Sequence, residues 1–282
     1  MNPNRRRLIA LPLLLALGKM LHAQPAGSAD PALDAEANPM WLQVRDSLFA
    51  GRAIHTPADD VLQLEAPARA EDAAIVPIAV RTRLAQTDAR YIRSIYLIID
   101  NNPSPLGAIF HFTPASGRAD IETRVRIDAY THVRAVAETS DGRLYMSTRF
   151  VKASGGCSAP PGKDAQAALA TLGRMRLRID GEPAAGRPVL AQLMVSHPNH
   201  SGLAMDQLTR HYTPAHYVRT VRVSYAGEPV MSAEVDFSIS ENPNFRFYFQ
   251  PAGQGELKAE VVDSNALRFE TALLVQPSKS TN

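Results

Sequence analysis

The chain has 282 residues, 45% of them hydrophobic, which is enough to bury two ordinary domain cores. Its formal net charge is +2, from 30 basic and 28 acidic residues, and no basic patch with interleaved aromatic residues occurs, so nucleic-acid binding has no support. Cysteine occurs once, at Cys157, which excludes a disulfide within the chain.

Residues 1–23 have the pattern of a secretory signal peptide: the arginines Arg5 to Arg7 precede the apolar run Leu8 to Gly18, and small residues follow. The apolar run is shorter than the ~20 residues that a membrane-spanning helix needs. We therefore expect cleavage near Gln24 and export to the periplasm, by the ordinary or the twin-arginine route. Because four of the 30 basic residues lie in the signal, the cleaved chain carries 26 basic against 28 acidic residues.

Residues 24–60 are predicted to form a flexible leader and one short helix. Asn38 is a typical helix N-cap, and Pro39 fits the first helical position. Trp41, the only tryptophan, is expected to pack this helix against a sheet rather than to bind a cofactor.

Two strand-rich segments follow, at residues 61–153 and 174–282, joined by a loop and a connector helix at residues 154–173. Alternating apolar and polar residues, as around Arg134, place one face of a strand in a core and the other in water. Turn sequences such as Ala226-Gly227 are typical of β-hairpins. The predicted fold class is all-β: two Ig-like antiparallel β-sandwich domains, each with its own core. Strands are expected at Val61–Glu65, Ile75–Arg83, Ile92–Asp100, Leu106–Phe112, Ile121–Ile127, His132–Glu138, Leu144–Val151, Val189–Ser196, Tyr217–Tyr225, Pro229–Phe237, Asn244–Gln250, Glu256–Val262 and Leu267–Val275.

The single thiol lies between the two segments, in Ser154-Gly155-Gly156-Cys157-Ser158-Ala159-Pro160-Pro161. Glycine permits positive φ and has no side chain, so Gly155 and Gly156 are expected to form a flexible arm that presents Cys157. Because the surrounding residues are polar and loop-forming, we do not expect the thiol to be buried. An unpaired thiol in an oxidising compartment is a candidate for covalent chemistry. The alternatives are an inert buried cysteine and a plain linker.

The reactive form of cysteine is the thiolate, whose formation nearby cations favour. Lys152 and Lys163 are the candidate cations, and an ordinary solubilising role for both remains open. No hydrolase signature surrounds Cys157, and a mobile arm is a poor platform for the rigid geometry of catalysis. We therefore assign no catalytic residue and expect no independent enzyme.

Histidines provide the best metal candidate by composition, in His197-Pro198-Asn199-His200 with His211 and His216 beyond. The proline argues against a helical pair of ligands, and no cysteine or carboxylate cluster adjoins the group. We therefore assign neither a metal nor a cofactor. His111 and His132 lie within strands and are assigned to structure.

Lys152-Ala153-Ser154-Gly155-Gly156-Cys157 resembles the Gly-Gly-Cys arm of SoxY, the sulfur-compound carrier of periplasmic thiosulfate oxidation. Ser196 to Gly202, Pro214 to Val218 and Gly227 to Val230 resemble stretches of its partner SoxZ. Together they resemble the fused SoxYZ-like carriers associated with quinoprotein dehydrogenases, over about residues 40–275. In SoxY the cysteine lies almost at the C-terminus, whereas here Ser158-Ala159-Pro160-Pro161 follow and both ends of the loop are anchored.

The resemblance implies a periplasmic carrier that holds a sulfur-containing group covalently on Cys157 while partner redox enzymes process it. The implied partners are periplasmic enzymes of sulfur compounds, with a quinoprotein dehydrogenase or a c-type cytochrome as further candidates; membrane insertion and nucleic acid are not implied. Two other functions stay open: a non-covalent accessory module of a quinoprotein dehydrogenase system, and a thiol- or copper-handling protein. An exposed Cys157 favours the carrier, a large apolar patch the accessory module, and imidazoles converging on the sulfur the metal protein.

Overall fold

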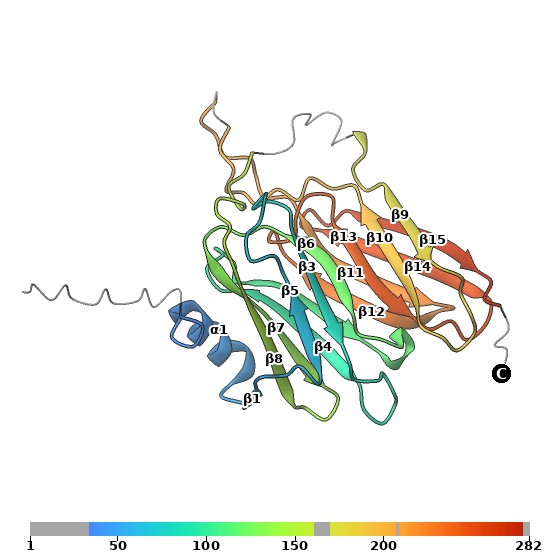
Figure 1. Ribbon diagram of the computed structural model, residues 1–282. Helices are drawn as coiled ribbons and strands as arrows, with labels where there is room; N and C mark the ends of the chain where they lie inside the picture. The colour runs from blue at the N-terminus through green and yellow to red at the C-terminus, as the bar shows by residue number, and fades with distance from the viewer. Residues whose placement is uncertain (1–33, 161–169, 207–208, 279–282) are drawn as a thin grey trace, which may run out of the picture.

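The computed structural model describes residues 34–160, 170–206 and 209–278. Within them the chain forms one α-helix and two sheets packed against each other (Figure 1). The elements are α1 (Pro39–Phe49), β1 (Ile54–His55), β2 (Leu62–Glu65), β3 (Val76–Thr82), β4 (Ile92–Ile99), β5 (Leu106–Phe112), the 3-10 helix η2 (Pro114–Ser116), β6 (Ile121–Val125), β7 (Thr131–Thr139), β8 (Leu144–Val151), β9 (Met175–Asp180), β10 (Val189–Val195), β11 (Val218–Tyr225), β12 (Glu228–Val235), β13 (Asn244–Phe249), β14 (Gly255–Asp263) and β15 (Arg268–Val275).

The predicted all-β class is confirmed, and every predicted strand forms with its ends within about two residues of the expected positions. Ala226 and Gly227, both at positive φ, make the predicted turn of the β11–β12 hairpin. Two strands were missed. β1 is only two residues long and pairs in parallel with β8, and β9 pairs with β10 at the edge of its sheet.

The two predicted Ig-like β-sandwiches are joined edge to edge rather than separate. The strand order β1-β8-β7-β4-β5-β12-β11-β14-β15 runs through both halves in one sheet, and β2-β3-β6-β13-β10-β9 does so in the other. Pairing of β5 with β12 and of β6 with β13 therefore joins them. Phe110 of the first half and Phe245 of the second lie in one core, with ring centroids 6.3 Å apart. The expectation of two separate cores is wrong, because both sheets continue across the boundary.

We call the junction formed by these two strand pairings the seam. Buried polar groups also join the two halves beside it. Arg126, which follows β6 and is 8% exposed, donates from Nη1 to the carbonyl oxygens of Phe237 and Ile239, at 3.0 and 2.8 Å. The Asn102 side-chain amide donates to the carbonyl of Arg126 at 2.8 Å and to Ser238 Oγ at 3.2 Å. The first half thereby satisfies two backbone oxygens and one hydroxyl of the second.

Helix α1 begins as predicted, since Asn38 Oδ1 accepts from the N–H groups of Met40 and Trp41 at 2.9 and 3.2 Å. Trp41 is 1% exposed and packs in a second apolar cluster with residues of β4, β7 and β8, which confirms its structural role. Arg134 was expected on the solvent face, and this is wrong. It is fully buried beneath the helix, 2.7 Å from Asp100 Oδ2 and 4.2 Å from the Trp41 ring centroid, so its charge is paired and covered.

The strand histidines make structural contacts, as expected: His111 Nδ1 lies 2.9 Å from Ser94 Oγ, and the His132 ring lies against Phe150. The signal peptide, most of the leader and most of the predicted connector helix lie outside the described residues. In the described part of the chain, no helix is both long and apolar enough to span a membrane.

Replacing Arg126 with methionine should destabilise the whole fold, because two buried carbonyl oxygens lose charged donors. We expect the free energy of unfolding to fall by about 1.5–3 kcal/mol in urea denaturation. Arg124→Met, at an exposed side chain two residues earlier, is the control and should unfold like the wild type. Equal loss in both variants would contradict the importance of this seam contact.

Candidate functional site

The single thiol is buried at the junction between the two halves. Cys157 is 1% exposed and lies in the loop after β8. Its carbonyl oxygen accepts a hydrogen bond of 2.5 Å from the hydroxyl of Ser201, a residue of the second half. The expectation of an exposed thiol is therefore wrong for this structure. The polar residues next to Cys157 in sequence do not reveal that a distant segment contacts the loop.

The two glycines before the thiol have different structural roles. Gly155 has a φ of +78°, in the positive range that was expected for this glycine. Gly156 allows a close approach, because a Cβ at that position would lie 2.1 Å from the carbonyl oxygen of Ala73. Their N–H groups donate to Asp128 and Ile127, at 2.8 and 2.9 Å. In this conformation the glycines hold the loop tightly against the first half.

Burial raises the pKa of the Cys157 thiol to about 12. The carboxylate of Asp128 adds to this rise, whereas the guanidinium of Arg126 opposes it. The sequence pointed to Lys152 and Lys163 as nearby cations; Lys152 is exposed, and Lys163 lies outside the described residues. Only the fold brings Arg126 close. Because the thiolate is the nucleophile, the closed thiol is protonated and unreactive.

The fold brings together His197, His216 and Asp263, three residues of the second half that the sequence did not group. Asp263 Oδ2 lies 2.7 Å from His216 Nε2 and 3.5 Å from His197 Nε2. The side chains of His197 and Asp263 are fully buried, whereas that of His216 is 15% exposed. The other carboxylate oxygen, Oδ1, accepts from the N–H groups of Asn265 and Leu267, both at 2.9 Å.

The hydrogen bonds of this cluster fit a neutral imidazole beside a carboxylate better than a metal centre. His197 Nδ1 accepts from the N–H of Asn199 at 3.0 Å, so the ring proton of neutral His197 lies on Nε2 and faces Asp263. A metal on Nε2 requires the reverse, with Nδ1 protonated and donating. Of the other predicted companions, His200 is half-buried and contributes its backbone to this region, and His211 is exposed.

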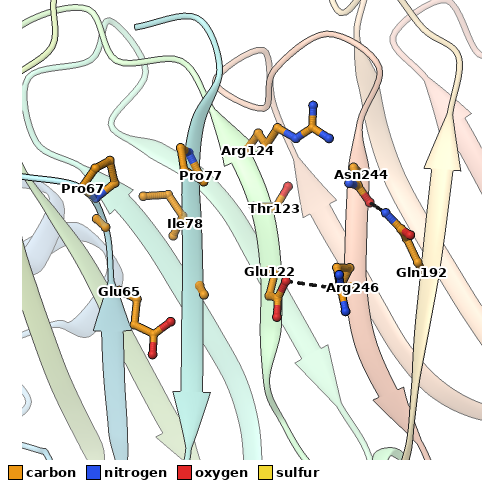
Figure 2. A pocket seen from close by; sticks show the side chains of 12 residues that line it. Glu65, Pro67, Pro77, Ile78, Glu122, Thr123, Arg124, Gln192, Asn244 and Arg246 are labelled. Atoms are coloured by element: carbon orange, nitrogen blue, oxygen red, sulfur yellow. Dashed lines mark hydrogen bonds and ion pairs between the residues drawn. The ribbon is translucent and has the colours of Figure 1, made fainter. Parts of the chain in front are cut away.

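A groove of about 600 Å³ lies on the outer face of the six-stranded sheet (Figure 2). Its floor crosses the seam: Glu122 of β6 lies 2.6 Å from Arg81 Nη1 and 3.3 Å from Nε of Arg246 on β13. Beside these ion pairs, the side-chain amide of Gln192 donates to Oδ1 of Asn244 at 2.8 Å. Since these groups are paired with one another, we interpret the groove as part of the contact between the halves.

Replacing Gly156 with alanine should open the cysteine loop, because the new methyl group would collide with the carbonyl of Ala73. We expect faster reaction of Cys157 with iodoacetamide, by at least about tenfold, since an exposed thiol regains a pKa of ~8.5. Gly253→Ala, at a glycine with no atom within 4 Å of an added Cβ, is the control. A wild-type thiol that reacts as fast as the urea-unfolded chain would contradict the closed loop.

The stability of the protein should fall at acid pH because of His197. Burial, together with the nearby His216, lowers the pKa of His197 to about 4 from an ordinary value of 6.5. Between these values the unfolded chain binds a proton that the folded chain does not, so the free energy of unfolding falls as the pH is lowered from 6.5 to 4, by up to about 3 kcal/mol. Urea denaturation at pH 7 and pH 4.5 measures this loss.

His197→Gln should flatten this decline, because its side chain does not titrate. The exposed His55 offers the matched control, and His55→Gln should decline like the wild type. An unchanged decline in His197→Gln would assign the acid sensitivity to other groups.

Two protein families match the chain. Residues 45–157 match the sulfur oxidation protein SoxY, and this match ends at Cys157. Residues 177–273 match the sulphur oxidation protein SoxZ. No curated protein matches the chain.

Solved structures show limited similarity. The sulfur carrier protein SoxY from Chlorobium limicola f thiosulfatophilum is 25% identical, with a TM-score of 0.34 over 40% of this chain and 91% of that chain. A superoxide reductase (neelaredoxin) from Ignicoccus hospitalis is 15% identical, with a TM-score of 0.28 over 41% of this chain and 89% of that chain. Red sea bream transglutaminase is 11% identical, with a TM-score of 0.23 over 90% of this chain and 34% of that chain.

The family matches follow the order of the two halves. They confirm the resemblance of the first half to SoxY and of the second half to SoxZ. The first ends at the single thiol, and the second runs from within β9 to within β15. With a SoxY domain at its N-terminal side and a SoxZ domain at its C-terminal side, the chain is a fused SoxYZ-like protein.

Proposed function

We propose that the protein is a periplasmic carrier that holds a sulfur-containing group covalently on Cys157 while partner redox enzymes act on that group. The observation that carries the proposal is the place of the cysteine: the SoxY match ends at Cys157, and Ser201 of the SoxZ half donates to the backbone carbonyl oxygen of that residue. The similar SoxY of Chlorobium limicola f thiosulfatophilum is a sulfur carrier protein by description. The reaction steps then belong to the partners, and the chain supplies the attachment atom.

Thiol–disulfide exchange loads the carrier without an external oxidant. The Cys157 thiolate attacks one sulfur of a sulfur–sulfur bond in an oxidised sulfur compound. A new bond forms to Cys157, the old sulfur–sulfur bond breaks, and its electron pair leaves with the other sulfur as a thiolate. The proton of Cys157 passes to solvent. Attack by a second thiol on the loaded sulfur reverses the process and releases the group.

This chemistry requires the cysteine loop to open. In the closed state the thiol is 1% exposed and its pKa is raised to about 12. Three hydrogen bonds hold the loop, from Gly155, Gly156 and Ser201, and each contributes about 0.5–1.5 kcal/mol net. An opening that costs a few kcal/mol is therefore compatible with a small open population, in which the thiol has its ordinary reactivity. Gly155 and Gly156 are proposed as the arm that moves in this opening.

Location and partners are part of the proposal. The signal-like pattern of residues 1–23 supports export to the periplasm. The SoxY and SoxZ matches support partners that process sulfur compounds there. A quinoprotein dehydrogenase and a c-type cytochrome are further proposed partners. The SoxY-like part at residues 61–153 and the SoxZ-like part at residues 174–282 would act as one unit, since both sheets pass through them.

Burial of the thiol favours a second candidate function. If the loop stays closed, Cys157 is inert, and the chain acts as a non-covalent accessory module of a quinoprotein dehydrogenase system. The two candidates differ in one measurable property, the uptake of a sulfur group by the folded protein.

The folded chain should gain one S₂O₃ unit at Cys157 when it is incubated with tetrathionate, because the thiolate displaces thiosulfate from that compound. Intact-mass spectrometry under non-reducing conditions detects the gain, and a reducing agent should remove it. Cys157→Ser should show no gain while unfolding like the wild type in urea.

Uptake by the urea-unfolded chain but not by the folded chain, over hours, would reject the carrier and support the accessory module. Uptake by Cys157→Ser would place the chemistry at another residue. Gly156→Ala should load faster than the wild type, because its loop is displaced from Ala73.

A further inference from the structure

A loop of the SoxZ half, residues 197–202, contacts the cysteine loop through one side chain. Ser201 is 8% exposed, and its hydroxyl donates to the carbonyl oxygen of Cys157 at 2.5 Å. The hydroxyl oxygen of Ser201 itself accepts from the N–H of Leu203 at 3.1 Å. Among the hydrogen bonds of the described residues, that from Ser201 is the one that joins Cys157 to the second half. The hydroxyl has one proton, so this contact uses its whole donor capacity.

The loop that presents Ser201 is held firmly by Asn199. This residue is fully buried and has a φ of +47°. Its side-chain amide donates to the carbonyl of Ile239 at 2.8 Å, and its Oδ1 accepts from the N–H of Val218 at 2.9 Å. Its own N–H donates to His197 Nδ1. Three separate contacts therefore fix the residue two positions before Ser201.

Asp263 fixes the residue directly before Ser201 through His216. The His216 N–H donates to the carbonyl oxygen of His200 at 3.0 Å, and the His216 ring lies 2.7 Å from Asp263 Oδ2. Asp263 stands at the end of β14 and is itself held by two backbone N–H groups. A continuous series of contacts therefore runs from the rigid sheet, through Asp263, His216 and His200, to Ser201.

We propose that residues 197–202 form a clasp in which the Ser201 hydroxyl controls the exposure of Cys157, with His216 and Asp263 as positioning residues that hold the clasp closed. The role of the clasp rests on the proposed carrier function. A carrier that is loaded only when the clasp opens keeps its thiol covered between encounters with partner enzymes. The SoxZ half thus controls access to a thiol that the SoxY half carries.

Iodoacetamide labelling of the folded protein at pH 7.5 measures clasp opening directly. Ser201→Ala removes the hydrogen bond and should raise the labelling rate of Cys157 about 2- to 10-fold, in proportion to the change in the opening equilibrium. Ser158→Ala is the matched control, because its exposed hydroxyl makes only a 3.4 Å contact within the cysteine loop. That variant should label at the wild-type rate.

Asp263→Asn tests the positioning role, since the amide keeps the shape of the carboxylate but loses the negative charge that faces Nε2 of His216 and of His197. It should also raise the labelling rate. If Asp263 acts through Ser201, the double variant Ser201→Ala with Asp263→Asn should label no faster than the faster of the two single variants. The reason is that the effects of substitutions in one series of contacts are not additive. Independent loosening of the whole fold would instead multiply the two effects. His216→Gln, at a partly exposed side chain, replaces Asp263→Asn if that variant does not fold.

An unchanged labelling rate in Ser201→Ala would overturn the clasp, and multiplied rates in the double variant would overturn the role of Asp263. Alkylation by iodoacetamide needs no sulfur compound, so the clasp proposal and the carrier proposal are tested independently of each other. Faster labelling of Ser201→Ala without uptake of S₂O₃ by any folded variant would reject the carrier alone. Uptake of S₂O₃ with equal labelling of Ser201→Ala and the wild type would reject the clasp alone.

Discussion

The pairing of β5 with β12 and of β6 with β13 is the constraint on which the rest of the structure depends. These two ladders turn the SoxY and SoxZ parts into one sandwich with a shared core. Covalent fusion adds to this arrangement a high effective concentration of one part near the other, in the millimolar range typical of short linkers. Because the two parts are joined in this way, the cysteine loop contacts residues of both.

Both halves determine the chemistry of the thiol. The first half receives the N–H groups of Gly155 and Gly156, and the second half contacts Cys157 through Ser201. Arg126, whose guanidinium spans the seam, opposes the rise of the thiol pKa, but burial is the larger effect. A thiol in this position is covered while the loop is closed, and the proposed carrier function requires the loop to open.

The histidine cluster shows why residue type alone does not identify a metal site. His197, His216 and Asp263 have suitable side chains at short distances. The hydrogen bond that His197 Nδ1 accepts from Asn199 fixes the ring proton on the nitrogen that faces the carboxylate. The same bond fixes the loop that carries Ser201. The cluster therefore supports the loop that carries Ser201, through the bond from His216 to His200.

The sequence by itself determined the strands other than β1 and β9, the capped helix around Trp41 and the SoxY and SoxZ resemblance, because alternation, turn residues, caps and short motifs depend on residues close together in the chain. It did not determine that both sheets cross the boundary, that Arg134 is paired and buried, that Cys157 is covered, or that Asp263 joins His197 and His216. Those properties arise from contacts between segments 34 to more than 100 residues apart, as in Arg134 with Asp100 and Arg126 with Phe237. Burial and strand partners are set by such distant contacts, so only the tertiary structure decided them.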